Sequence, residues 1–197
     1  MEIIKTIEIR RSTRKFTNQE VDKNIIENIL KAAINAPSPK NNQPWKFIVI
    51  TKEKKQELVK VMQNGIEDLK NSFEIVLKEK NFLATAEPSL KIMEEAPVII
   101  LVLNTENKQS GRQTPVRKYL EMANILSAGA AIENILLASL EYGLGSLCIS
   151  DIYFVIDEIS GWLNTDRQII AAVALGYPAE SPAPLKKKEM DSLVEWK

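Results

Sequence analysis

Apolar runs typical of buried strands alternate along this chain with longer segments of helical periodicity. The clearest strand is PVIILVL at 97–103, and further runs are WKFIVIT, SLCI and QIIAAVALGYP. The longest helical pattern extends from Lys118 to Tyr142, where Gly143 is placed to end it. Because strands interleaved with helices bury a sheet between helical layers, we expect one domain over 1–197, with a central sheet covered on both faces.

Composition excludes several classes of function. Lysine plus arginine equals aspartate plus glutamate at 26 each, so no global field recruits nucleic acid or an anionic membrane. The chain has no histidine and a single cysteine, Cys148, which excludes histidine-based catalysis, histidine-ligated zinc and a cysteine-only metal site. We find no apolar run near the roughly 20 residues that span a bilayer and no signal peptide, so a cytoplasmic location is expected.

A local basic cluster, RRSTRKF at 10–16, stands out against this balance. It follows a short apolar pattern that predicts an amphipathic opening helix, and helical spacing would place Arg10 and Arg14 on one face. Arginine forks suit phosphate oxygens, and Ser12 adds a hydroxyl donor between them. The cluster is either a solvated helix end or half of a pocket whose other half lies elsewhere in the chain.

Three further stretches could carry chemistry. APSPKNNQPW at 36–45 combines prolines with side-chain amides, which can hydrogen-bond to the carbonyl and N–H groups at the edge of a heterocycle. Alternatively, it is simply a polar loop between a helix and a strand. GLGS at 143–146 follows a helix and precedes a strand, which is the wrong order for a dinucleotide fingerprint. KKK at 186–188 lies in a proline-stiffened tail and alone indicates a solvated surface.

Together these stretches resemble the nitroreductase family of FMN-dependent oxidoreductases. The resemblance begins with RRSTRKF and APSPKNNQPWKFIVI, and continues through AAIENILLASLEYGLGSLCI to ALGYPAE and the basic tail. It implies an α+β fold of three layers, in which a mostly antiparallel sheet is flanked by helices. It also implies an intertwined homodimer with FMN at the subunit interface, in which the tail, about 179–197, packs on the partner.

The resemblance implies a role for each residue of the basic cluster. Arg10 and Ser12 would hold the FMN phosphate and ribityl chain, with Arg11 beside them. Arg14 would lie near flavin N1 and the C2 carbonyl, where its charge favours the reduced flavin. No protein side chain is expected to act as the catalytic group, since the flavin carries the chemistry.

The remaining contacts would come from three other places in the chain. Asn41 would bond the pyrimidine edge, and Ser38 in the same loop would add a backbone or hydroxyl contact. Lys187, flanked by two rival lysines, would close on the phosphate where relatives often have arginine. Many relatives carry a glycine near flavin N5, but here the chain reads CISDI, so Ser150 or Asp151 is expected at that place.

The activity implied is hydride transfer from NAD(P)H to the flavin and then to a nitroaromatic, a quinone or a similar small-molecule acceptor, in a two-step exchange. Reductive dehalogenation or flavin cleavage on the same scaffold are alternatives, and a substrate lid within 64–92 would discriminate them. A protein that binds flavin without catalytic turnover is a further alternative, from a different functional class. A nucleic-acid binder using the basic runs is disfavoured by the balanced charge.

Overall fold

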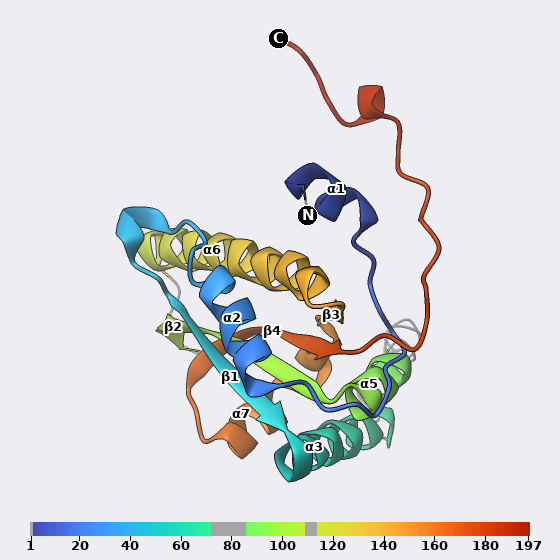
Figure 1. Ribbon diagram of the computed structural model, residues 1–197. Helices are drawn as coiled ribbons and strands as arrows, with labels where there is room; N and C mark the ends of the chain where they lie inside the picture. The colour runs from blue at the N-terminus through green and yellow to red at the C-terminus, as the bar shows by residue number, and fades with distance from the viewer. Residues whose placement is uncertain (1, 72–85, 109–113) are drawn as a thin grey trace.

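The computed structural model describes residues 2–71, 86–108 and 114–197, and it shows a four-stranded sheet between two layers of helices (Figure 1). The strands are β1 (Trp45–Thr51), β2 (Val98–Lys108), β3 (Gly145–Ile149) and β4 (Arg167–Gly176). The helices are α1 (Ile3–Ile9), α2 (Lys23–Ala33), α3 (Lys52–Asn71), α5 (Ala86–Glu95), α6 (Pro115–Glu141) and α7 (Ile156–Leu163), with short 3₁₀ turns η1 (Pro39–Asn41), η2 (Asp151–Val155) and η3 (Met190–Ser192).

The sheet has the order β1-β2-β4-β3, and every neighbouring pair of these strands is antiparallel. Alternate side chains of β2 point to opposite faces, as the pleat requires. Ile99 and Leu101 face the layer of α3, α5 and α7, whereas Ile100 and Val102 face α2 and α6. The chain therefore has the α+β architecture and the three layers that we expected, with apolar packing on both faces of the sheet.

Helix α6 runs the length of one sheet face and is the longest element. Thr114 caps it by accepting a hydrogen bond from the Arg117 N–H at 3.1 Å, and Gly143 just beyond its end adopts φ 67°. By length and composition it could cross a membrane, with a mean hydropathy of 1.4, so our expectation that no run approaches that length was too strict. Its buried residues pack on the sheet and α2, which makes it a core helix.

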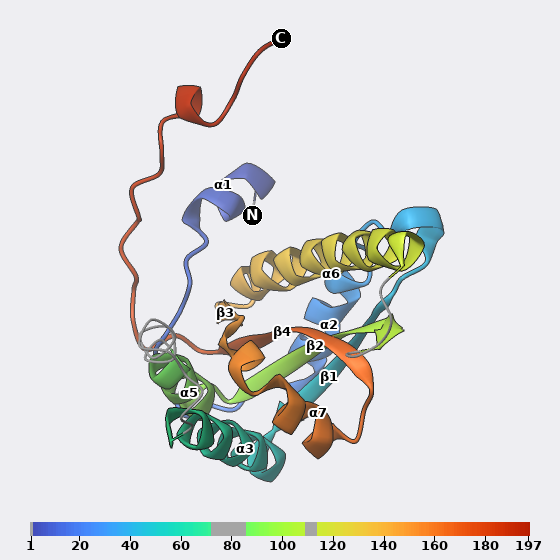
Figure 2. The same cartoon turned by 180° about the vertical axis from the view of Figure 1, so that it is seen from behind.

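The N-terminal and C-terminal segments of the chain both extend away from the sheet and its helical layers. Helix α1 and the segment after Pro178 extend on the same side of the molecule, and the C-terminus projects past α1 (Figures 1 and 2). The isoleucines of α1 are all exposed, as are several large apolar residues of the tail. Neither segment contributes a residue to the two apolar clusters of the core, and the packing of the tail on a partner stays a prediction.

Two local features differ from what the sequence pattern suggests. The residues from 104 are polar, as in a loop, but β2 continues to Lys108 through irregular pairing with β4. Buried Asn104 is accommodated there because its amide donates to Gln168 Oε1 at 3.1 Å and accepts from Asn124 Nδ2 at 3.3 Å. The opening helix ends at Ile9, so Arg10 and Arg14 do not share a helical face.

Candidate functional site

The basic cluster is extended backbone that pairs with the edge of the sheet. Ser12 forms a parallel bridge with Ser146 at the start of β3, and the Thr13 N–H donates to the Ser146 carbonyl at 3.1 Å. Phe16 forms an antiparallel bridge with Pro178, directly after β4. The cluster is therefore fixed between the beginning of β3 and the beginning of the tail.

Glu180 connects the cluster to the tail. Its Oε1 accepts hydrogen bonds from the backbone N–H groups of Arg14 at 2.6 Å and Lys15 at 3.2 Å, and the Ala179 N–H donates to the Lys15 carbonyl at 2.9 Å. Bonds from amides to a carboxylate are charge-assisted and stronger than neutral ones. Glu180, the acid of the GYPAE segment, thus holds the arginine segment next to the start of the tail.

A cavity of about 630 Å³ opens between the cluster, α1 and the tail. It collects cations from both ends of the chain, because Lys187 lines it together with the arginines. Of the three successive lysines, Lys187 is the one that lines it. The lining consists of Ile7, Glu8, Arg10, Arg11, Ser12, Arg14, Pro182, Ala183, Leu185 and Lys187.

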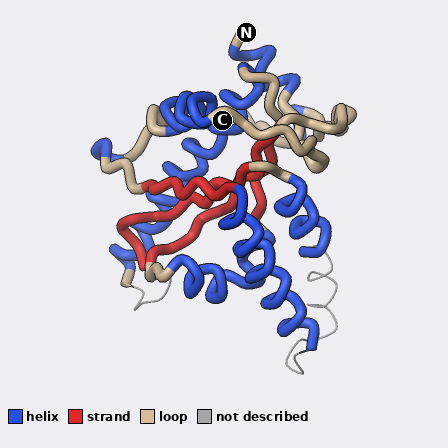
Figure 3. Tube along the Cα trace, turned by 60° about the horizontal axis from the view of Figure 1, so that its bottom comes forward, coloured by secondary structure: helices blue, strands red, loops and turns tan. Residues whose placement is uncertain are grey.

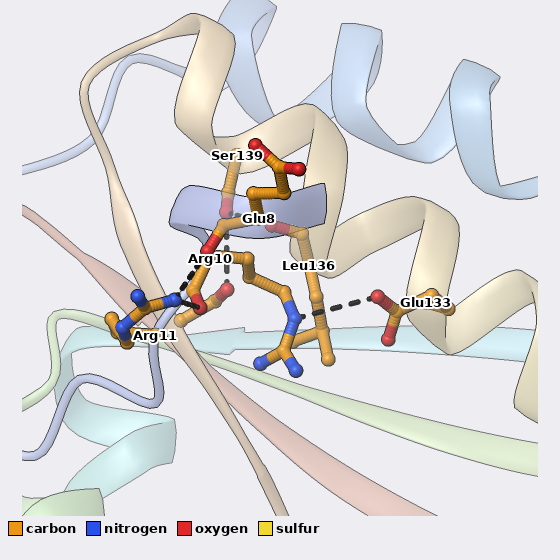
Figure 4. A network of polar contacts seen from close by, with 7 residues as sticks. Glu8, Arg10, Arg11, Glu133, Leu136 and Ser139 are labelled. Atoms are coloured by element: carbon orange, nitrogen blue, oxygen red, sulfur yellow. Dashed lines mark hydrogen bonds and ion pairs between the residues drawn. The ribbon is translucent and has the colours of Figure 1, made fainter. Parts of the chain in front are cut away.

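The arginines are held in different ways (Figure 4). Arg10 Nε lies 3.4 Å from Glu133 Oε1 on α6. One terminal nitrogen of Arg11 donates to the carbonyls of Glu8 at 2.6 Å and Arg10 at 2.7 Å. Because these contacts use only part of each guanidinium fork, further N–H donors of Arg10 and Arg11 are available to an anion in the cavity.

The loop that contains Ser38 and Asn41 lies elsewhere. It sits beside the N-terminal end of α6 in Figures 1 and 2, whereas Arg10 pairs with Glu133 in the C-terminal half of that helix. Within one chain these predicted residues are therefore not brought together with the cavity. Their separation along a helix of 27 residues amounts to several turns.

The loop is rigid and strained. Lys40 and Asn41 both have φ 55° and Gln43 has φ 48°, a left-handed conformation that costs non-glycine residues about 1–3 kcal/mol each. The Gln43 N–H donates to Ser38 Oγ at 2.9 Å, and the Thr105 N–H donates to the Pro44 carbonyl at 2.8 Å. Since Ser38 Oγ already accepts, its hydroxyl proton is left to donate.

A second cavity, of about 760 Å³, lies where α2 and α3 begin, but its charges already serve local structure. Lys52 pairs with Glu20 at 3.3 Å, and Asp22 caps α2 by accepting from the Asn24 N–H at 2.7 Å. Lys55 donates to the Ala96 carbonyl at 2.9 Å beyond the end of α5, and its burial lowers its pKa. We assign this cavity no ligand.

The family follows from a comparison with known proteins. The model described as the nitroreductase family matches residues 7–177, which contain the paired basic cluster, the strained loop and the complete sheet. The chain belongs to the nitroreductase family. Similar curated proteins include an NADH dehydrogenase of Thermus thermophilus, 27% identical over 95% of this chain and 92% of its own length.

Other relatives carry different names. An iodotyrosine deiodinase of Thermotoga neapolitana is 29% identical over 89% of this chain and 87% of its own length. Among solved structures, an FMN- and NADPH-dependent nitroreductase from Sphingopyxis is 20% identical, with a TM-score of 0.77 over 100% of this chain and 99% of that one. The latter match establishes the fold.

In this member of the nitroreductase family, the turn that follows β3 does not line the cavity of the arginines and Lys187. Ser150 is exposed just before η2 and does not line the cavity. Asp151 accepts a hydrogen bond from the Ser89 hydroxyl of α5, and so connects the end of β3 to that helix. The proposed lid, 64–92, includes 72–85, which lie outside the described residues, so only its two helical ends are placed.

Sequence reasoning missed two acidic residues that hold the arginine segment, Glu133 and Glu180. Glu180 lies in the quoted ALGYPAE motif, which marks it as a candidate without indicating its partners. Glu133 is an ordinary acid in the AIEN stretch of α6 and has no local signal. Their roles arise from contacts between distant parts of the chain.

Proposed function

We propose that this chain is an FMN-dependent oxidoreductase that accepts hydride from NAD(P)H and reduces a small-molecule acceptor. The observation that carries the proposal is the cavity shared by the N-terminal arginines and Lys187. When bound, FMN would supply a ring that takes up and releases hydride, which accounts for a site without histidine.

The donor set fits the phosphate end of FMN. A dianionic phosphate loses hydration on binding and needs cationic and hydroxyl donors to offset that loss. Arg10, Arg11, Ser12 and Lys187 provide these donors from several directions around one cavity. Lys187 would bind as a point charge where an arginine would form a two-pronged contact.

The ring end of the proposed site requires a second copy of the chain. Ser38 and Asn41 lie away from the cavity of their own chain, so in a homodimer the loop of one copy would meet the cavity of the other. In this proposal Asn41 bonds the pyrimidine edge, the Ser38 hydroxyl donates to a ring acceptor, and Arg14 stabilises negative charge near N1. Ser150 or the adjacent Asp151 would approach N5.

Exposed apolar side chains support the homodimer. Soluble monomers rarely expose large contiguous apolar patches, and such patches mark interfaces. Here Trp196 is 86% exposed and Leu126 is 73% exposed. Exposed apolar residues lie on α1, along α6 and in the tail: Ile3, Ile4, Ile7, Ile9, Val116, Tyr119, Leu120, Met122, Ile125, Leu126, Leu185, Met190, Leu193, Val194 and Trp196.

A second candidate is reductive dehalogenation on the same flavin. The support is the iodotyrosine deiodinase relative, which is 29% identical over 89% of this chain. The donors that would hold the cofactor are the same in both cases. An anaerobic panel of quinones, nitroaromatics and halogenated phenols, assayed with NADH and NADPH, distinguishes the two by which acceptor reoxidises the flavin.

The flavin itself is tested by purification and mixing. We expect yellow protein with flavin absorbance that bleaches on rapid anaerobic mixing with NADH or NADPH. The R10A variant should lose most of the flavin, whereas K60A, which removes an exposed cation from α3, should retain it. Colourless wild-type protein that gains no flavin on reconstitution would refute the proposal, and slow bleaching would indicate a binding protein without turnover.

A further inference from the structure

Arg10 is oriented by a residue outside the cavity. It follows α1 directly, its N–H donates to the Thr6 carbonyl at 3.1 Å, and its side chain is 29% exposed. Its Nε faces Glu133 Oε1 at 3.4 Å, and its two terminal nitrogens point away from that carboxylate (Figure 4). Glu133 is not among the residues that line the cavity.

The contact determines which edge of the guanidinium an anion can use. The fork is planar and rigid, so a carboxylate that pairs with Nε favours one orientation of its plane and leaves free the edge formed by the terminal nitrogens. The acceptor also sits on a firm support, because α6 has 27 residues and packs on the sheet, whereas α1 has seven residues and none of them is buried. Glu133 is therefore the anchor and Arg10 the group that it orients.

We propose that Glu133 is a positioning residue that presents the terminal edge of Arg10 to the phosphate of the flavin. This inference rests on the proposed function. The carboxylate acts in two opposing ways, because its geometry favours phosphate binding and its negative charge disfavours it. Glutamine retains an acceptor oxygen without the charge, whereas alanine removes both, so two substitutions at one position separate the two effects.

The test measures dissociation constants for FMN and for riboflavin, which lacks the phosphate, with apoprotein of the wild type, E133Q and E133A. We expect E133Q to bind FMN at least as tightly as the wild type. E133A should bind FMN about threefold more weakly than E133Q, the size expected for a half-exposed contact at 3.4 Å. Riboflavin affinity should be the same in all three, and E53A, which removes an exposed acid from α3, should match the wild type for both flavins.

Two results would overturn the inference. Equal FMN affinity of E133A and E133Q would show that the acceptor does not orient Arg10. A parallel loss of FMN and riboflavin affinity in E133A would show general damage to the fold, which a role limited to the phosphate does not produce. Wild-type protein that binds neither flavin overturns the proposed function itself, an outcome that is distinct from both.

Discussion

Replacing Gly145 with alanine should detach the arginine segment from the sheet. A Cβ at Gly145 would lie 2.4 Å from Thr13 Oγ1 and 2.7 Å from both Thr13 Cβ and Cγ2. Thr13 is 4% exposed, so its side chain has no room to swing aside. Ordinary contact begins near 3.4 Å, so the segment must move by about 1 Å, which would strain the Thr13–Ser146 hydrogen bond. Overpacking of this kind costs about 1–3 kcal/mol.

Chemical denaturation and flavin titration together measure the effect. We expect G145A to lower the free energy of unfolding by about 2 kcal/mol and to weaken FMN binding, because Ser12 and Arg14 move with Thr13. Adding T13A removes two of the three close atoms and should restore part of both. The control is G161A on α7, where a Cβ meets nothing within 4 Å, and it should gain up to about 1 kcal/mol from helix propensity. A G145A protein with wild-type stability and flavin affinity would refute the close approach.

Two further predictions concern acidic neighbours of the site. Cys148 reaches solvent, but neighbouring protein atoms partly desolvate its thiol and raise its pKa, and the Glu133 carboxylate raises it further, so its thiolate should appear at higher pH than that of a free cysteine. Alkylation rates from pH 7 to 10 measure this, and a profile in E133Q that does not move to lower pH would contradict it. E180Q keeps an acceptor for the Arg14 and Lys15 amides but removes a negative charge beside Arg14. The reduced flavin carries negative charge, so the flavin reduction potential should rise by about 20 mV, equivalent to roughly 1 kcal/mol. An unchanged or lower potential in spectroelectrochemical titration would contradict this.

Local sequence patterns predicted most helices and strands, because these depend on the spacing of apolar residues and on the residues that end helices. Val98 to Leu103 are apolar on both faces, as a strand between two helical layers must be, and Gly143 has the left-handed conformation that ends α6. The extension of β2, one of the strands drawn in red in Figure 3, as far as Lys108 could not be predicted in this way. Its polar Asn104 resembles a loop residue, and its burial is explained by hydrogen bonds to the amides of Gln168 and Asn124 and from the Glu106 N–H.

The candidate site was predicted less completely than the fold. The resemblance selected Arg10, Ser12, Arg14 and Lys187, and the structure places all four around one cavity. Their function there remains a prediction, as do the roles of Ser38, Asn41 and Ser150, which lie outside that cavity. The contact of Glu133 with Arg10 could not be predicted from the sequence, because no periodicity relates a residue of α6 to one that follows α1.

The central claim is that the arginines and Lys187 of one chain share each flavin with the 38–43 loop of another. Complementation tests it most directly, since R10A should lose the flavin and N41L should lose activity while keeping the flavin. In a heterodimer purified with two different tags, one site carries both substitutions and the other carries neither. We predict NAD(P)H-dependent activity of about half the wild-type value, as two-fold symmetry requires. Activity no higher than that of the two parent homodimers would contradict the claim, because it would place both halves of the site in one chain.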